Sequence, residues 1–168
     1  MPGPFSVVPL DLDADRSGFA CGVEPLDRYF KTQISQDIKR RVTACFTALD
    51  AKGRVAGYYT LATASILLTD LAENLSKKLP RYPHVPAVRM GRLAVDQDFK
   101  GKGLGAALLA DALRRAVTAE IAAYAFVVDA KDPSAAEFYA HHGFLATADN
   151  PLFLYLPLAT AKDLVKRS

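Results

Sequence analysis

A glycine-rich junction between a strand and a helix constrains this chain more than any other feature. The apolar run Val88–Val95 predicts a strand, and three closely spaced glycines follow it at Gly101, Gly103 and Gly105. Directly behind them, apolar residues recur at helical spacing. Glycine lets the backbone approach a ligand, and a helix N-terminus offers N–H groups and partial positive charge. The junction therefore predicts an anion site, most naturally for phosphate.

Two common phosphate loops do not fit this spacing. A Walker A loop requires Gly-Lys followed by Ser or Thr, and the chain contains neither sequence. A dinucleotide-binding fingerprint requires Gly-x-Gly-x-x-Gly near the first strand, whereas these glycines alternate in mid-chain. From the loop alone, a glycine-rich turn without a ligand stays open as an alternative.

Length and composition predict one globular domain over residues 1–168. Hydrophobic residues make up 51% and charged residues 23%, which excludes whole-chain disorder. Cys21 and Cys45 have no partner at a recognisable spacing, so we expect small buried residues in a reducing compartment. The three histidines and two cysteines show no ligand spacing, and no metal site is predicted.

Targeting and membrane segments are not predicted. No apolar run reaches the roughly 18 residues of a membrane helix, and the N-terminus does not resemble a secretory signal. We therefore expect a cytoplasmic protein that does not enter a membrane. The net charge of +3 is compatible with a polyanionic partner but does not require one.

The remaining patterns predict an α+β fold with one mixed sheet flanked by helices. Strand composition marks residues 5–9, 42–49, 55–68, 88–95, 124–128, 144–146 and 152–158. Helical spacing or capping residues mark a helix from Pro25, a helix at 70–78 with a capping box, the helix behind the glycines, one between Asp132 and Gly143, and one at 159–167.

Two segments together resemble the GCN5-related N-acetyltransferase (GNAT) family. The family's pyrophosphate loop is similar to Lys100-x-x-Gly103-x-Gly105, with Lys in place of Gln or Arg. A second family pattern follows one strand and one helix later, and it matches Ala135, Tyr139, Gly143 and Phe144. The resemblance implies a single-domain GNAT fold whose mixed sheet splays between the fourth and fifth strands.

The resemblance also implies acetyl-CoA as co-substrate and a set of site residues. Tyr139 would be the general acid that protonates the departing CoA thiolate. Asp132 stands where the family usually has Asn. The residues implied to bind acetyl-CoA are Leu93, Ala94, Val95, Lys100, Gly101, Lys102, Gly103, Leu104, Gly105, Ala106, Asp132 and Ala135.

Further segments are similar to one branch of the family, the toxins of bacterial toxin–antitoxin pairs that acetylate aminoacyl-tRNA. They are Phe19–Gly22 with Leu26 and Asp27, Gly57–Leu61, Gly91–Asp96, and Asp129 with Ala130. This resemblance implies that the acceptor is the α-amino group of aminoacyl-tRNA. It also implies a ribbon-helix-helix antitoxin as partner and a homodimer.

The strand before the loop lacks the Glu that many family members use as general base. An α-amine, with a reference pKa of about 7.7–8.0, is partly neutral without a base, whereas a lysine amine at about 10.4 is not. The missing carboxylate therefore favours an α-amine as acceptor. Fallback bases are His84, His141 and His142.

Basic residues before the loop predict a rim that binds tRNA phosphates. Arg89 and Arg92 fall on opposite faces of the strand, so one of them should border the acceptor site. The rim would include Lys77, Lys78 and Arg81. Two alternatives stay open: a GNAT enzyme acting on a small amine or a protein N-terminus, and a non-catalytic acyl-CoA-binding or antitoxin-docking protein.

Overall fold

Strands form where the sequence is rich in β-branched and aromatic residues, as the computed structural model of the chain shows. The structure describes residues 5–166. Within that range, seven strands join in one sheet with the order β1-β2-β3-β4-β5-β7-β6. Antiparallel pairs and the parallel pair β4–β5 occur in the same sheet. The predicted α+β fold with a mixed sheet is therefore confirmed.

The described residues fall into two compact units, each built from two stretches of chain. Unit 1 contains residues 5–62 and 91–112, and unit 2 contains residues 63–90 and 113–166. Two long strands, β3 (Val55–Leu67) and β4 (His84–Val95), contribute residues to both units. The single domain expected over the whole chain stays a prediction.

The strands of unit 1 are antiparallel. β1 (Ser6–Pro9) pairs with β2 (Ala44–Leu49), and Ser6 lies opposite Leu49. β2 continues into β3 through a tight turn in which Gly53 takes a φ of +80°. This confirms the predicted first strand and the predicted hairpin.

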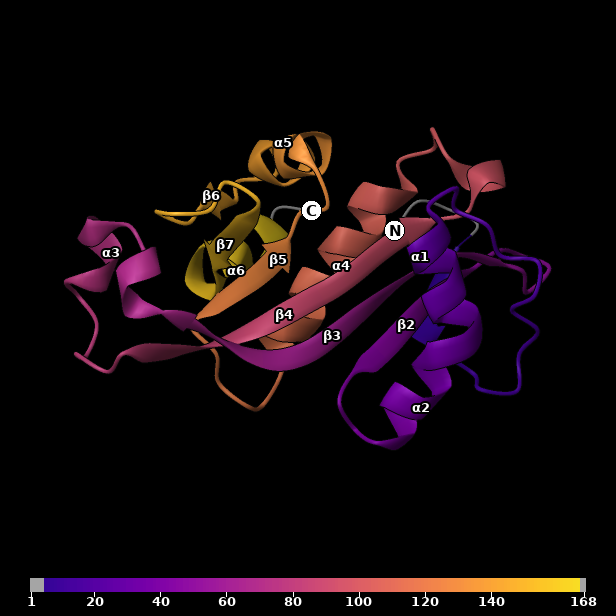
Figure 1. Cartoon of the computed structure of the whole chain (residues 1–168), viewed down its shortest axis with the longest axis horizontal. Coiled ribbons are helices and arrows are strands. Elements are labelled where there is room, and N and C mark those ends of the chain that lie inside the picture. The colour runs from indigo at the N-terminus through magenta and orange to yellow at the C-terminus, as the bar shows by residue number, and fades with distance from the viewer. Residues whose placement is uncertain (1–4, 167–168) are drawn as a thin grey trace. The chain divides into compact units, whose positions relative to one another are not determined.

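The first predicted helix forms in three parts: α1 (Glu24–Arg28), a π-helical turn (Tyr29–Gln33) and α2 (Ile34–Lys39). The N–H of Ile34 donates to the carbonyl of Tyr29, five residues earlier, which defines a π-turn. The spacing of apolar residues predicts a regular α-helix here, so the π-turn corrects that prediction. Figure 1 shows α2 beside β2, which its contacts agree with.

The core of unit 1 is aromatic. Phe30 stacks on Tyr58 with ring centroids 4.3 Å apart, and Phe19 contacts both rings. Cys21 and Cys45 are buried in the same cluster, which confirms their interpretation as small core residues.

Unit 2 contains the complete strands β5, β6 and β7, and part of β4. β5 (Ala125–Asp129) runs parallel to β4, with Ala87 opposite Ala125. β7 (Phe153–Pro157) pairs antiparallel with β5, and the short β6 (Leu145–Ala146) pairs with β7. These strands agree with the predicted ranges to within a few residues.

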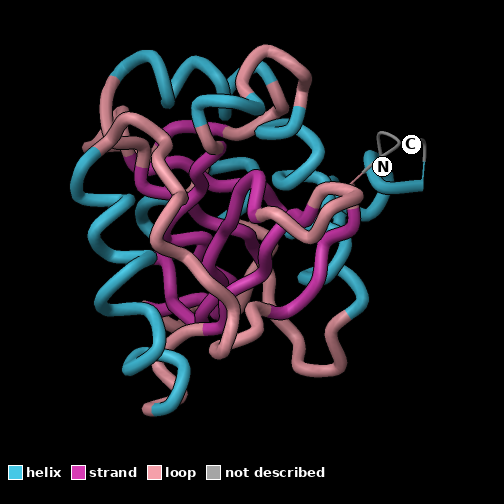
Figure 2. The backbone as a smooth tube through the Cα atoms, turned by 90° about the vertical axis from the view of Figure 1, so that its right-hand side faces the viewer, coloured by secondary structure: helices cyan, strands magenta, loops and turns pink. Residues whose placement is uncertain are grey.

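Three further helices form as predicted: α4 (Leu104–Thr118), α5 (Pro133–His141) and α6 (Leu158–Lys166). Asp132 caps α5, and its carboxylate accepts the N–H of the third residue after it at 2.8 Å. Figure 2 traces these helices in cyan against strands in magenta. Arg167, which ends the predicted terminal helix, lies outside the described residues.

The short helix predicted after the hairpin is wrong in extent. A 3-10 turn (Leu68–Asp70) and α3 (Glu73–Ser76) form instead, separated by extended backbone at Leu71 and Ala72. Leu71 is buried in an apolar cluster, and the N–H of Ala72 donates to the Tyr155 hydroxyl at 2.8 Å. These tertiary contacts outweigh local helix propensity. The expected capping box is also wrong, because the residue before α3 is Ala72, which has no capping side chain.

Two absences within residues 5–166 bear on function. No helix there is long and apolar enough to cross a membrane. In the same range, no three side chains of His, Cys, Asp or Glu gather in a way that could hold a metal ion.

Candidate functional site

The glycine loop of unit 1 has an open backbone face. Gly101 and Gly103 adopt φ values of +79° and +77°, a region that glycine occupies without strain. A Cβ added at either position would meet no atom within 4 Å. The loop leads directly into α4, whose first-turn N–H groups lack intrahelical acceptors. This combination of open backbone and helix N-terminus suits a phosphate group.

A buried carboxylate fixes the start of this loop. Asp96 is 2% exposed and accepts the N–H groups of Ala20 and Asp98 at 3.0 and 2.9 Å. The guanidinium of Arg54 lies 3.3 Å from the same carboxylate and 2.6 Å from that of Asp98. Asp96 belongs to the Gly91–Asp96 segment named in the sequence analysis but has no predicted role there, although its position at the end of a strand and before a turn is typical of a capping residue.

Both loop lysines contact protein groups. Lys100 Nζ donates to the carbonyl of Cys21 at 2.6 Å, and Lys102 Nζ lies 5.6 Å from the Phe99 ring centroid. Gly22 in the same segment has a φ of +92°, a backbone conformation that favours glycine, and the N–H of Gln97 donates to the Ala20 carbonyl at 2.9 Å. The Phe19–Gly22 segment therefore braces the glycine loop.

The end of β4 packs closely against β3. Three residues at this end are among those predicted to bind acetyl-CoA: Ala94 is buried, and Leu93 and Val95 are half-buried. A Cβ at Gly57 would lie 2.8 Å from the Ala94 carbonyl oxygen, so glycine is required there. The N–H of Arg92 donates to the buried Thr60 hydroxyl at 3.1 Å.

The remaining predicted loop residues lie in the first turn of α4. Leu104 is buried, and Gly105 and Ala106 are half-buried. A Cβ added at Gly105 would lie 3.9 Å from the Val95 side chain, which is an ordinary van der Waals distance. The end of β4, the glycine loop and the first turn of α4 therefore all lie in unit 1.

Arg92 stacks on an aromatic ring. Its guanidinium carbon lies 3.4 Å from the ring centroid of Tyr29, at the start of the π-helical turn. The Tyr29 hydroxyl donates to Asp37 at 2.6 Å. Burial and this hydrogen bond raise the pKa of Tyr29, while the same bond lowers the pKa of Asp37. In the sequence, Tyr29 falls at an ordinary apolar position of the helix predicted from Pro25, and nothing there indicates its contact with Arg92.

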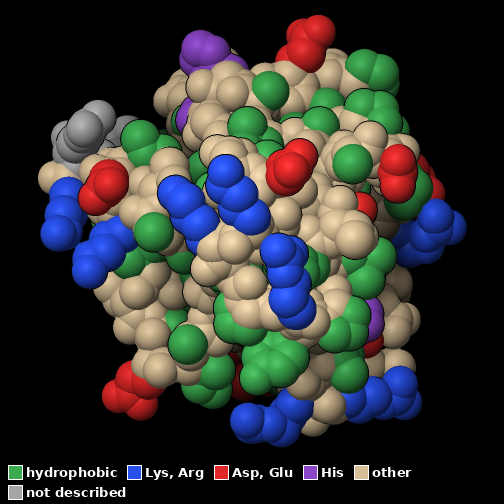
Figure 3. All heavy atoms as spheres, turned by 90° about the vertical axis from the view of Figure 1, so that its left-hand side faces the viewer, with side chains coloured by type: hydrophobic (Ala, Val, Ile, Leu, Met, Phe, Trp, Pro, Cys, Tyr) green, Lys and Arg blue, Asp and Glu red, His purple; other side chains and the backbone are tan. Residues whose placement is uncertain are grey.

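The other predicted rim residues belong to unit 2. Arg89 forms an ion pair with Asp129, at the end of β5. The other three, Lys77, Lys78 and Arg81, are exposed in the segment around α3. Figure 3 views the molecule from the side of α3 and shows Lys and Arg side chains interspersed with hydrophobic ones.

Tyr139 has a buried ring on α5 in unit 2. Phe138 and Phe144 flank it at centroid distances of 5.3 and 5.6 Å. Burial raises the pKa of Tyr139 to about 12, so its hydroxyl keeps its proton at neutral pH. No partner within residues 5–166 bonds this hydroxyl, and no fully buried side-chain oxygen in that range is unpaired. The hydroxyl therefore keeps access to solvent or a ligand.

The other predicted residues of unit 2 have local roles. The Asp132 carboxylate is engaged by the N–H of Ala135 as the α5 cap. Among the fallback bases, the ring Nδ1 of His142 lies 2.8 Å from the Phe138 carbonyl, and His141 and His84 are exposed. The backbone N–H of His142 donates to the Tyr139 carbonyl at 2.9 Å, but no hydrogen bond within residues 5–166 joins any of the three imidazoles to the Tyr139 hydroxyl.

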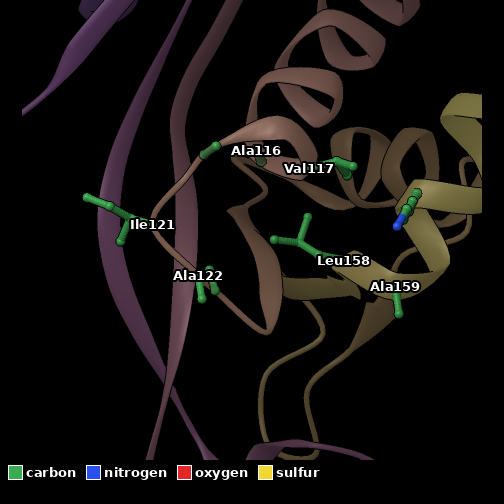
Figure 4. Close-up of a pocket in the computed structure, with 9 residues that line it drawn as sticks. Ala116, Val117, Ile121, Ala122, Leu158 and Ala159 are labelled. Atoms are coloured by element: carbon green, nitrogen blue, oxygen red, sulfur yellow. The ribbon is translucent and has the colours of Figure 1, made fainter.

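A pocket of about 210 Å³ in unit 2 involves none of the predicted site residues. Alanine and larger aliphatic side chains line most of this pocket, and Lys162 also lines it. Figure 4 labels Ala116, Ile121 and Leu158 among the lining residues. Burial raises the pKa of the Cys21 thiol, and it raises the pKa of the Cys45 thiol to about 12, so both thiols stay protonated at neutral pH.

The sequence matches the family described as acetyltransferase (GNAT) domain over residues 20–153. That range includes the glycine loop, the end of β4, Asp132, Ala135 and Tyr139. The chain belongs to the GNAT family, which confirms the resemblance and makes the protein an acetyltransferase by family.

Within the GNAT family, the chain is similar to toxins, one of which acetylates tRNA. The chain is 33% identical to a tRNA-acetylating toxin of Mycobacterium tuberculosis (strain ATCC 25618 / H37Rv) over 153 residues, covering 90% of each protein. It superposes on AtaT complexed with acetyl-methionyl-tRNAfMet with a TM-score of 0.88, 28% identity and coverage of 95% and 98% of the two chains. A mutant AtaT toxin bound to the C-terminus of antitoxin AtaR and acetyl-CoA gives a TM-score of 0.80 at 25% identity, covering 96% and 98%.

Proposed function

We propose that this protein transfers the acetyl group of acetyl-CoA to the α-amino group of aminoacyl-tRNA and thereby blocks translation as the toxin of a toxin–antitoxin pair. The observation that carries the proposal is the likeness, over nine tenths of both chains, to a tRNA-acetylating toxin. The solved relative with acetyl-methionyl-tRNA supports the same acceptor class. The relative that binds acetyl-CoA supports the same donor.

The residues of unit 1 fit acetyl-CoA. The uncovered backbone of Gly101 and Gly103, with the first turn of α4, would hold the pyrophosphate through N–H groups. Lys100 and Lys102 add positive charge at the edge of the loop. The backbone of Leu93, Ala94 and Val95 would orient the thioester end. Acetyl-CoA supplies the activated acetyl group, and the protein supplies positioning and a proton donor.

The chemistry requires one proton donor at the departing sulfur. The neutral amine attacks the thioester carbonyl carbon, a C–N bond forms and the C–S bond breaks. The amine nitrogen loses a proton to solvent, the CoA thiolate takes a proton from the Tyr139 hydroxyl, and the Tyr139 phenolate then takes a proton back from solvent, so that no net proton is consumed. Tyr139 suits this role because it is neutral at physiological pH and its hydroxyl is not engaged by a described residue.

The acceptor need not be activated by a strong base. An α-amine with a pKa of about 8 is neutral in a useful fraction of molecules near pH 7.5. The exposed or carbonyl-bonded histidines described above give no evidence of a dedicated base. This supports an α-amine over a lysine side chain as the acceptor.

The basic residues would bind the tRNA backbone. We assign this role to Arg92 in unit 1 and to Arg89, Lys77, Lys78 and Arg81 in unit 2. Phosphate contacts of this kind position a nucleic acid without reading its sequence, and they weaken as salt is added.

Partners and location follow from the same proposal. An antitoxin would neutralise the protein, as AtaR forms complexes with AtaT in the solved relatives. We expect this antitoxin to have a ribbon-helix-helix fold, the protein to act in the cytoplasm, and the toxin to form a homodimer. Co-purification from the host and the mass of the isolated complex would test these expectations.

A cell-free translation reaction tests the function. Purified protein added with acetyl-CoA should stop peptide synthesis, and the same protein after removal of acetyl-CoA should not. The Tyr139→Phe variant is the matched control and should leave synthesis nearly intact. Translation that continues at full rate with protein and acetyl-CoA present would contradict the toxin function.

A further inference from the structure

The two arginines of the proposed rim differ in how much of their charge is available. Arg89 is paired with the carboxylate of Asp129. Arg92 forms no ion pair or side-chain hydrogen bond to any residue in 5–166, and its contact is the face of the Tyr29 ring. A stacked guanidinium keeps the N–H groups at its edge, which lie in its own plane, free to bind an anion in a bidentate way.

The π-helical turn places Tyr29 under this arginine. Tyr29 is 8% exposed and its neighbour Phe30 is fully buried, so two consecutive side chains of one helix face the core. Within this turn, the Thr32 hydroxyl donates to the carbonyl of Arg28 at 2.7 Å. π-turns are rare and are frequently found at functional sites.

Asp37 completes the arrangement from about two turns of helix further along, eight residues after Tyr29. Its carboxylate accepts the Tyr29 hydroxyl at 2.6 Å and the Gln33 amide at 3.3 Å. A phenol that donates to a carboxylate has a more electron-rich ring, and such a ring attracts a cation more strongly. Asp37 also lies within the field of Arg92, since that charge contributes to lowering the pKa of Asp37.

We propose that Tyr29, oriented by Asp37, is a positioning residue that holds the guanidinium of Arg92 for a phosphate of the aminoacyl-tRNA acceptor. The inference rests on the proposed function and extends it, because it names which arginine binds the phosphate and what holds that arginine in place. Arg92 is half-buried and stacked, so it loses less side-chain freedom on binding than the exposed Lys77 or Lys78 would.

The test separates the ring from the charge. Four variants are compared: Arg92→Gln, Tyr29→Leu, Tyr29→Phe and the double variant Arg92→Gln with Tyr29→Leu. The KM for total aminoacyl-tRNA, the KM for acetyl-CoA and kcat are measured for each. Binding of uncharged tRNA is titrated at several salt concentrations. Lys39→Gln, which removes an exposed charge from α2, is the control for a change in net charge.

Arg92→Gln should raise the KM for aminoacyl-tRNA about 10- to 100-fold and reduce the salt slope of tRNA binding by about one. Tyr29→Leu should raise that KM about five- to tenfold, in line with the loss of a cation–π contact. Tyr29→Phe keeps the ring but loses the hydrogen bond to Asp37, so its KM should lie between those of the wild type and Tyr29→Leu. The KM for acetyl-CoA should stay constant throughout, and Lys39→Gln should resemble the wild type.

The double variant decides whether Tyr29 acts through Arg92. Its KM for aminoacyl-tRNA should equal that of Arg92→Gln alone. Additive losses, or a Tyr29→Leu variant with wild-type KM, would overturn the positioning role while leaving the proposed function intact. A wild-type protein that neither binds nor acetylates tRNA would instead overturn both.

Discussion

The glycine loop of unit 1 and the Tyr139 region of unit 2 are stabilised by different interactions. The loop is fixed by polar contacts, in which Asp96 binds two N–H groups and Arg54, and Lys100 binds a carbonyl. Tyr139 is fixed by its aromatic neighbours, and its hydroxyl is left without a described partner. The polar contacts fix the backbone of the loop that would bind an anion. The aromatic packing fixes the Tyr139 ring and leaves its hydroxyl available. Binding and chemistry should therefore be separable by mutation.

The largest separation is expected for Tyr139→Phe. The ring and its packing are kept and only the proton donor is lost, so kcat should fall by roughly 10²–10⁴. The melting-temperature shift caused by acetyl-CoA should stay close to that of the wild type. A variant with wild-type kcat would show that the acid is another group and that Tyr139 belongs only to the core.

Gly103→Asp should produce the opposite pattern. At a hundredfold excess over Kd, a ligand stabilises the native state by about 2.7 kcal/mol, and this variant should lose that stabilisation. The new side chain places bulk and negative charge where the pyrophosphate would bind. Gly53→Asp is the matched control, since Gly53 also has positive φ with open space around it, but in the hairpin turn. A thermal shift that survives in Gly103→Asp would place acetyl-CoA elsewhere.

Asp96→Ala should weaken the loop without touching the acid. It removes the acceptor of the Ala20 and Asp98 N–H groups, and leaving such groups unpaired costs about 1–3 kcal/mol. Unfolding in urea should show this loss, and the apparent affinity for acetyl-CoA should fall. At saturating acetyl-CoA, kcat should remain within a fewfold of wild type. A large loss of kcat with unchanged affinity would contradict the division between the two regions.

The pH profile gives the smallest effect. Because burial raises the pKa of Tyr139 to about 12, its hydroxyl stays protonated through the range in which aminoacyl-tRNA can be assayed. The kcat/KM for aminoacyl-tRNA should rise through the pKa of the acceptor amine and then level off below pH 9. A decline between pH 7.5 and 9 that disappears in Tyr139→Phe would show that Tyr139 loses its proton far earlier than its burial implies.

The sequence predicted the elements whose signals are local. The glycine loop, the Asp132 cap and the hairpin at Gly53 each depend on residues within a few positions of one another, and all three formed. The capping box at Asp70 failed because a distant residue, Tyr155, bonds the chain where the helix would begin. Local patterns are reliable only where no tertiary contact competes with them.

Within the candidate site, the contacts that were missed join residues far apart in sequence. Arg92 stacks on Tyr29, and Lys100 bonds the Cys21 carbonyl, across more than 60 positions in each case. A π-turn also has no distinctive apolar spacing, so the periodicity of residues 26–38 indicated an ordinary helix. Residue type and local spacing could therefore indicate which residues belong to the candidate site, but not which of these residues contact one another.

Transfer of labelled acetyl groups tests the central claim most directly. Purified protein is incubated with labelled acetyl-CoA and either total aminoacyl-tRNA or a panel of free amines and peptides. The account predicts label in the tRNA fraction, and its loss on mild alkaline deacylation, because the acetyl group leaves together with the ester-linked amino acid. Label in the amines or peptides, with none in tRNA, would contradict the account and favour a small amine or protein N-terminus as acceptor.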